Sequence, residues 1–432
     1  MPKDVRIICI FIVLALVSGG FTGCRKKEAP LIPEDADPTG MGVSFLYPFT
    51  RAPEDAFLEL VGRFNDTNPW NIQVNSEYAG TWEDLYAYLA EGASCGSLPD
   101  AAIMSPVEGV RFGETGYAKD LEPYIESEEW GFGGEPDALL TEFIEAHREL
   151  AVSGGLYSLP FSQSAYVLYY NRELLVRSGF KNPPDTWEEF RNIAGGLHDK
   201  GESSVPLAYY SSPEILETIG LGFGGDNGRS GVYHFSGKDM KEALSLIREF
   251  HSMDFVKPFL DPWDSQSAFC DSGAVFAIDS SEALVNYDRT ICSVKGGMDW
   301  GAVPVPASKA GGDVLCEGIS WVIFPSNASR ELAVWLFISW LTEPEQQVFW
   351  SESTLSLPCS EEAWGLLLAN PDLSKPYLEL LATSRERRKC IRGSSRLSWQ
   401  SEETVCRMLD EAVSTGDIDS AVRIIEDLME GM

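Results

Sequence analysis

The chain has 432 residues, 44% of them apolar, and it carries 66 acidic against 33 basic residues, a formal net charge of −33. This length exceeds what one hydrophobic core usually supports, so two lobes are expected. The acidic excess would repel nucleic-acid phosphates and anionic lipid surfaces, so no nucleic-acid partner is expected. No pair of histidines has the spacing that places two ligands on one helix face, so we expect no metal site. No cofactor is expected either.

The N-terminus has the parts of an export signal. Lys3 and Arg6 precede an apolar run over residues 7–17, and small residues follow that run. Eleven apolar residues are too few to cross a bilayer core, which needs about 20. We therefore predict a signal peptide over residues 1–23. The alternative is a buried N-terminal strand.

Residues 21–24 read Phe-Thr-Gly-Cys and resemble the bacterial lipobox, with Phe21 in place of the usual leucine. The resemblance implies that Cys24 is acylated, carries a palmitate-type anchor and becomes the mature N-terminus. A polar tether over residues 24–40, rich in proline and glutamate, would then separate the membrane anchor from the folded part.

Cysteine usage agrees only partly with export. Seven cysteines follow Cys24, and an odd number cannot all pair within one chain. Their wide spacing is not that of a disulfide scaffold. Buried free thiols are the expectation, with one or two bridges as the alternative.

Strand and helix patterns alternate along the chain. Residues 81–89 form a predicted helix in which Thr81 and Asp84 have the spacing of a capping box. Thr186 and Glu189 have the same spacing, so Trp187 is expected in the core. The predicted strands are 43–47, 72–76, 101–104, 166–170, 275–279 and 319–324, and the other predicted helices are 57–64, 187–197, 238–251 and 331–341. This order predicts an α/β protein whose sheets lie between helices.

Four segments resemble one family in the same order. Residues 159–175 read LPFSQSAYVLYYNRELL, and residues 183–190 read PPDTWEEF. These segments closely resemble the middle of the family 1 extracellular solute-binding proteins, the maltose-binding and glycerol-phosphate-binding relatives. The other matching segments are 80–84 with 98–100, 300–304 leading to 318–321, and 333–345 with Trp350 and 357–358.

The resemblance implies a two-lobed periplasmic-binding-protein fold of type II, with a ligand cleft between the lobes. One lobe would comprise residues 41–155 plus 303–345, and the other residues 156–302 plus 346–432. It also implies a monomer that delivers a sugar, an oligosaccharide or a glycerol phosphate to the membrane-spanning permease subunits of an ABC importer. Closure of such a cleft would bury the solute on both faces.

Several residues are candidates for contacting the solute. Aromatic platforms with carboxylate, amide and hydroxyl partners suit a sugar. The resemblance points to Trp82, Glu83, Ser162, Gln163, Ser164, Gly318 and Trp321. Residues 162–164 lie between a proline and a predicted strand, where we expect a loop whose hydroxyl and amide groups can face a cleft. Position after a predicted strand points to Ser105, Glu108, Asp279, Ser280 and Ser281, and Tyr209 and Tyr210 are further stacking candidates. Helix capping and ordinary packing remain the alternatives, with Glu83 as an acid in the first turn and Asp279 to Ser281 as an N-cap.

A basic segment over residues 385–396 interrupts the acidic background. Such a run is usually a solvated loop. In glycerol-phosphate binders an arginine in a comparable segment holds the phosphate, and the resemblance makes Arg396 its nearest match. The tyrosine that those binders carry before a Leu-Pro pair is absent from residues 353–356, so a neutral sugar is favoured.

Two other function classes compete with delivery to a permease. A lipoprotein that senses a solute without transport needs the same cleft. A secreted carbohydrate-active enzyme would need a spaced pair of carboxylates, and no such pair stands out among the 66 acids. No enzymatic activity is therefore expected.

Overall fold

The computed structural model describes residues 32–132, 136–200, 205–223, 238–293, 297–309, 314–385, 388–392, 407–408 and 410–423. Cys24, Arg396 and the predicted signal peptide lie outside these residues. Within the described part of the chain, no helix combines the length and the apolar character needed to cross a membrane.

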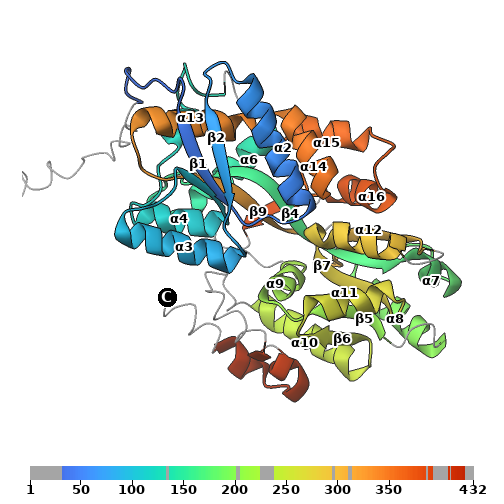
Figure 1. Ribbon diagram of the computed structural model, residues 1–432. Coiled ribbons are helices and arrows are strands. Elements are labelled where there is room, and N and C mark those ends of the chain that lie inside the picture. Colours follow the sequence, from blue (N-terminus) through green and yellow to red (C-terminus); the bar gives the residue numbers. More distant parts are fainter. Residues whose placement is uncertain are drawn as a thin grey trace, which may run out of the picture.

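The first lobe surrounds a half-sheet with the strand order β2-β1-β3-β9. Its strands are β1 (Gly42–Tyr47), β2 (Gln73–Tyr78), β3 (Ala101–Met104), β9 (Val314–Ile323) and β10 (Arg388–Arg392), which pairs with β9. Its helices are α2 (Ala52–Thr67), α3 (Trp82–Cys95), α4 (Pro106–Glu114), α5 (Glu122–Ile125), α6 (Ala138–Leu150), α13 (Ala328–Trp340), α14 (Pro344–Thr354), α15 (Glu361–Leu368) and α16 (Lys375–Ser384). Figure 1 shows this lobe above the second one.

The second lobe surrounds a half-sheet with the order β7-β5-β6. Its strands are β5 (Val205–Tyr210), β6 (Val256–Phe259), β7 (Ala274–Ser280) and β8 (Trp300–Pro304). Its helices are α7 (Arg172–Arg177), α8 (Trp187–Lys200), α9 (Pro213–Leu221), α10 (Lys238–Ser252), α11 (Pro262–Cys270), the 3₁₀ turn η1 (Ser281–Ala283) and α12 (Leu284–Ser293). Near the C-terminus, Asp419 pairs with Lys241 of α10 at 2.6 Å.

A single long strand, β4 (Leu159–Asn171), joins the two half-sheets into one sheet. Its first half, up to Ala165, pairs with β9, and its second half, from Tyr166, pairs with β7 and β8. All three pairings are antiparallel, whereas β1, β2 and β3 are parallel to one another, as are β5, β6 and β7. Because β3 is also antiparallel to β9, the carboxyl ends of the two parallel sets point toward each other, and we call them the facing edges.

Two hydrophobic cores stabilise this arrangement. In the first, the ring of Phe57 stacks on Trp321 with centroids 5.3 Å apart, and Phe45 packs edge-on against Phe337 at 5.0 Å. In the second, Phe190 lies 5.0 Å from Phe250 and 5.7 Å from Phe276. Trp187 is 3% exposed and belongs to this second core, as the sequence predicted.

Helix α16 connects the first lobe to the far end of β4. Glu379 of α16 accepts hydrogen bonds from the Tyr170 hydroxyl at 2.7 Å and from Arg172 Nη2 at 2.8 Å. A Cβ at Gly301 of β8 would come within 2.1 Å of the Glu379 carboxylate, so glycine makes room for this contact. The tyrosine ring also lies under the Arg172 guanidinium, 4.8 Å away.

The predicted elements are present, with different lengths. The helix expected over 57–64 extends over α2 and ends before Asn68-Pro69, as predicted, and both capping threonines accept a backbone N–H, Thr81 from Asp84 and Thr186 from Glu189. The strand expected over 166–170 extends over the whole of β4, and the one expected over 319–324 begins at Val314. The loop expected at residues 162–164 is therefore wrong, since these residues lie inside β4.

The junction between the lobes is closely packed at Gly318. This residue of β9 pairs with Gln163 of β4, and a Cβ there would lie 2.5 Å from Gln163 Nε2. Gln163 is 4% exposed, and its Nε2 donates to the Cys359 thiol at 3.6 Å, so its side chain has little freedom to move.

We predict that Gly318→Ala lowers the free energy of unfolding by about 1–3 kcal/mol, the usual cost of overpacking. The midpoint of urea denaturation measures it. Gly62→Ala is the matched control, because Gly62 is exposed within α2 and a Cβ there meets nothing within 4 Å; this change should stabilise by about 0.5–1 kcal/mol. Equal behaviour of the two variants would contradict the packing argument.

Candidate functional site

Tyr166 lies where β4 passes from one half-sheet to the other. It pairs with Ser280 at the carboxyl end of β7, and its neighbour Ala165 pairs with Cys316 of β9. Helix α9 packs against β4 and β9 at this junction. Elements from both lobes therefore meet at the half-buried side chain of Tyr166.

The charges of four carboxylates act on the Tyr166 hydroxyl. Burial first, and then the charges of nearby carboxylates, raise its pKa well above the usual value, so the phenol stays protonated and can donate a hydrogen bond. The carboxylates are those of Glu214 (α9), Asp279 (β7), Glu282 (η1) and Glu317 (β9). This group, together with the phenol, is called the Tyr166 cluster below. It favours ligand groups that donate hydrogen bonds or carry positive charge.

Three hydrogen bonds hold the Asp279 carboxylate of the Tyr166 cluster. Its Oδ2 accepts from Gln266 Nε2 at 3.0 Å and from the Tyr287 hydroxyl at 3.2 Å, and its Oδ1 accepts from the Ser280 N–H at 2.8 Å. These bonds lower its pKa, but burial outweighs them and raises the pKa to about 6. A carboxylate with such a pKa gains or loses a proton near neutral pH.

Hydrogen bonds also fix the backbone beside Asp279. The Ser281 hydroxyl accepts from the Ala165 N–H at 2.9 Å, and the Tyr169 hydroxyl donates to the Ser280 carbonyl at 2.8 Å. Ser280 caps η1 by accepting from Glu282 N–H at 3.3 Å, which is the alternative role that the sequence left open for this segment.

The first lobe contributes a second group of candidate residues at its facing edge. Trp82 begins α3, is 38% exposed and lies 6.0 Å from the ring of Tyr86, whose hydroxyl accepts from the Ser105 N–H at 3.1 Å. Ser105 caps α4, and Glu108 forms an ion pair with Arg111 at 3.0 Å. Burial raises the pKa of Glu108 although Arg111 opposes the shift. Glu83 is exposed beside Trp82.

An exposed tryptophan on the opposite edge escaped the sequence analysis. Trp263 follows β6, lies in the first turn of α11 and is 57% exposed. Trp263 therefore has the same kind of position in the second lobe as Trp82 has in the first, at the start of a helix that follows a strand. The only sequence signal was an apolar residue directly after Asp261-Pro262, a pattern that caps and starts a helix. Tyr166, Glu214, Glu282 and Glu317 were also missed.

Most of the remaining candidates are buried, whereas Gly318 and Tyr210 are half-buried. Ser162, Gln163 and Ser164 are each less than 5% exposed within β4, and Gly318 packs against Gln163. Trp321 is fully buried in the first core. Tyr209 is 3% exposed in the second core, and Tyr210 at the end of β5 is half-buried. The structure thus brings Asp279 and Ser280 to the Tyr166 cluster and places Trp321 away from it. A contact with solute stays a prediction for all of them.

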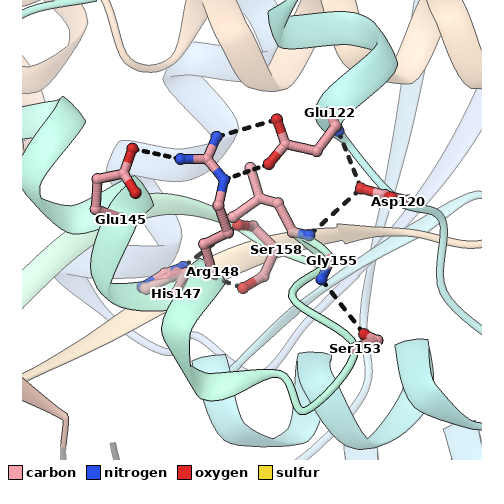
Figure 2. Close-up of polar contacts among 9 residues, drawn as sticks. Asp120, Glu122, Glu145, His147, Arg148, Ser153, Gly155 and Ser158 are labelled. Carbon is pink, nitrogen blue, oxygen red and sulfur yellow. Dashed lines mark hydrogen bonds and ion pairs between the residues drawn. The ribbon is translucent and has the colours of Figure 1, made fainter. Parts of the chain in front are cut away.

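An ionic and hydrogen-bonded network holds the segment that leads into β4. Figure 2 shows Arg148 of α6 between Glu122 and Glu145, with Nη2 3.0 Å from Glu122 Oε2. His147 Nδ1 lies 3.1 Å from the Ser158 hydroxyl, directly before the strand. Asp120 accepts backbone N–H groups from residues 122 and 156. The start of β4 is thereby anchored to the first lobe.

The described part of the chain was also compared with the requirements of a metal site and of a disulfide. No group of three or more His, Cys, Asp or Glu side chains there is arranged to hold a metal ion. Cys95, Cys270 and Cys359 are free thiols. Cys359 is buried, in line with the expectation from the sequence, whereas Cys95 is exposed.

Comparison with known proteins agrees with this geometry. Residues 59–364 match the family model described as bacterial extracellular solute-binding protein. A putative binding protein of Brucella abortus is 25% identical over 322 residues, covering 71% of this chain and 73% of its own length. The sn-glycerol-3-phosphate-binding periplasmic protein UgpB of Escherichia coli K12 is 23% identical over 389 residues, covering 83% and 87%.

A solved structure shows the same two-lobed fold. The sugar-binding protein MalE of Xanthomonas citri superposes with a TM-score of 0.73 at 20% identity, and the match covers 90% of this chain and 97% of that one. This likeness confirms the α/β, two-lobed fold expected from the sequence. The lobe boundaries given above stay a prediction.

Ser281 provides a test of what holds the junction. We predict that Ser281→Ala lowers the free energy of unfolding by about 1–3 kcal/mol, because the buried Ala165 N–H loses its acceptor. Urea denaturation measures the loss. Ser94→Ala on the exposed face of α3 is the control and should change little. An unchanged Ser281→Ala variant would mean that the hydroxyl does not stabilise the junction.

Proposed function

The chain belongs to the bacterial extracellular solute-binding proteins, and on that premise we propose that it captures a neutral, hydroxyl-rich solute. A sugar or sugar-like compound fits best, and delivery would be to the permease subunits of an ABC importer. The observation that supports this ligand class most is the Tyr166 cluster. Its carboxylates accept hydrogen bonds from hydroxyl groups, whereas a phosphate there would meet like charge.

Exposed aromatic side chains support the same ligand class. Trp82 and Trp263 stand on the two facing edges, and an indole ring can cover the apolar face of a sugar. Closure of the lobes would then bury the solute between rings from both sides while its hydroxyls meet the carboxylates. The named relatives bind glycerol phosphate or sugar, so the phosphate ester is the competing ligand.

A phosphate ligand would require a nearby cation in a chain of net charge −33. Arg396 is the proposed candidate for that cation by resemblance, and it lies outside the described residues. A charged hydrogen bond to phosphate is worth roughly 1.5–3 kcal/mol, so its loss would be easy to measure. The two ligand classes therefore depend on different side chains.

We expect a thermal-shift screen to show stabilisation by a neutral sugar such as maltose or raffinose and none by sn-glycerol 3-phosphate, because a ligand that binds only the folded state raises its stability. Trp82→Ala and Trp263→Ala should each weaken sugar binding about tenfold, or about 1.4 kcal/mol. Arg396→Ala should change it little.

Tyr117→Ala is the control for these tryptophan variants. Tyr117 is 40% exposed, and two residues later Lys119 donates its backbone N–H to Ile323, at the edge of the sheet away from the facing edges. A large loss of affinity in Arg396→Ala together with none in Trp82→Ala would identify a phosphate ester as the solute. Stabilisation by no compound in the screen would count against solute capture itself.

We also propose export and lipid anchoring at Cys24, because only a thiol can receive the diacylglycerol group. Cys24→Ala should abolish labelling with a palmitate analogue and release the protein from the membrane fraction. Cys95→Ala, which removes an exposed thiol of the folded part, should leave both unchanged. Membrane partition of the Cys24→Ala variant equal to that of the wild type would overturn the proposal. We propose no turnover of the solute.

A further inference from the structure

Asp279 has nearly all of its hydrogen-bonding capacity occupied. An ionised carboxylate offers about four acceptor positions, and three of them are filled by Gln266, Tyr287 and the Ser280 N–H. These donors come from α11, from α12 and from the residue after Asp279 itself. One acceptor position remains, and its direction is fixed by the other three.

Titratable groups from several elements interact with Asp279. The charge of Asp279 raises the pKa values of Tyr166 and Tyr169 of β4. It also raises those of Glu282 of η1 and Tyr287 of α12. Farther away, Glu214 of α9 and Glu317 of β9 act on the shared Tyr166 hydroxyl, and Cys270 of α11 acts on Tyr287. Burial opposes ionisation of Asp279, and the hydrogen bonds from Gln266, Ser280 and Tyr287 favour it.

We propose that capture of a solute at the Tyr166 cluster is linked to the release of a proton from Asp279. A solute hydroxyl would donate a hydrogen bond to the last acceptor position of the carboxylate. In the protonated acid, the proton occupies one of the acceptor positions, so this hydrogen bond would be lost. The proton passes to the buffer, and the carboxylate is left hydrogen-bonded to the solute. This inference rests on the proposed function, since it requires that the solute binds beside Asp279.

The linkage predicts how affinity depends on pH. The pKa of Asp279 in the free protein is about 6, so about half of the molecules carry the proton at pH 6. If only the carboxylate binds, the affinity falls nearly tenfold for each pH unit below that value and is constant above about pH 7. An anionic solute would show the opposite dependence, because it would bind the protonated form better.

Calorimetric titration at pH 6 with maltose and with raffinose tests the linkage. In MES and in cacodylate buffers, whose ionisation enthalpies differ, the wild type should release about half a proton per solute bound. Asp279→Asn should release none and should lose the pH dependence of its affinity. The exposed Asp372→Asn, on the loop before α16, should behave as the wild type. Equal proton release in wild type and Asp279→Asn would overturn the proposal.

A measurement without solute separates this proposal from the proposed function. Because the folded-state pKa of Asp279 is raised, the folded chain holds a proton that the unfolded chain has released above about pH 4. Its contribution to the free energy of unfolding therefore falls as the pH rises from about 4 to 7.

Asp279→Asn should accordingly gain melting temperature relative to the wild type as the pH rises through that range, and Asp372→Asn should not. If the melting temperatures of the wild type and of Asp279→Asn change with pH in the same way, Asp279 does not hold the proposed proton. This test does not require a known solute. Solute binding without proton release would overturn the linkage and leave the proposed function intact.

Discussion

The antiparallel passage of β4 through both half-sheets is the constraint on which the rest of the structure depends. Because β4 runs antiparallel to β9 in one lobe and to β7 in the other, the parallel strands of the two lobes end opposite each other. Open α/β sheets bind ligands at the carboxyl ends of their strands. One strand thus brings the two facing edges together, and Tyr166 lies where they meet.

Burial of the polar groups at this shared edge lowers the stability of the fold, and apolar burial in the two cores offsets that loss. Asp279 keeps its position through three donors although burial disfavours its charge. The fully buried rings of Trp321, Phe190 and their neighbours lie away from this edge and provide apolar burial in each lobe. The contact of Glu379 with Tyr170 and Arg172 then ties α16 to the second half-sheet. The Tyr166 cluster and the two hydrophobic cores therefore occupy different parts of the same sheet.

Local signals in the sequence predicted what depends on local interactions. Both capping threonines, the stop of α2 at Asn68-Pro69 and the burial of Trp187 follow from contacts within a few residues. The resemblance to solute-binding proteins predicted the two lobes. The polar run at residues 162–164 was misread as a loop, because its backbone partners, such as Gly318 and Leu357, lie far away in the chain. Tyr166 and Glu317 were missed for the same reason, since nothing near them in sequence shows that they meet.

The position of β9 in the chain also has a consequence for the order of synthesis and folding. Ala101 of β3 pairs with Ile323 of β9, and strands β5 to β8 of the second lobe are translated between them. The first half-sheet therefore cannot close until β9 has been made, and such distant pairings make folding slow. The first lobe thus cannot complete its sheet before all four of those strands have left the ribosome.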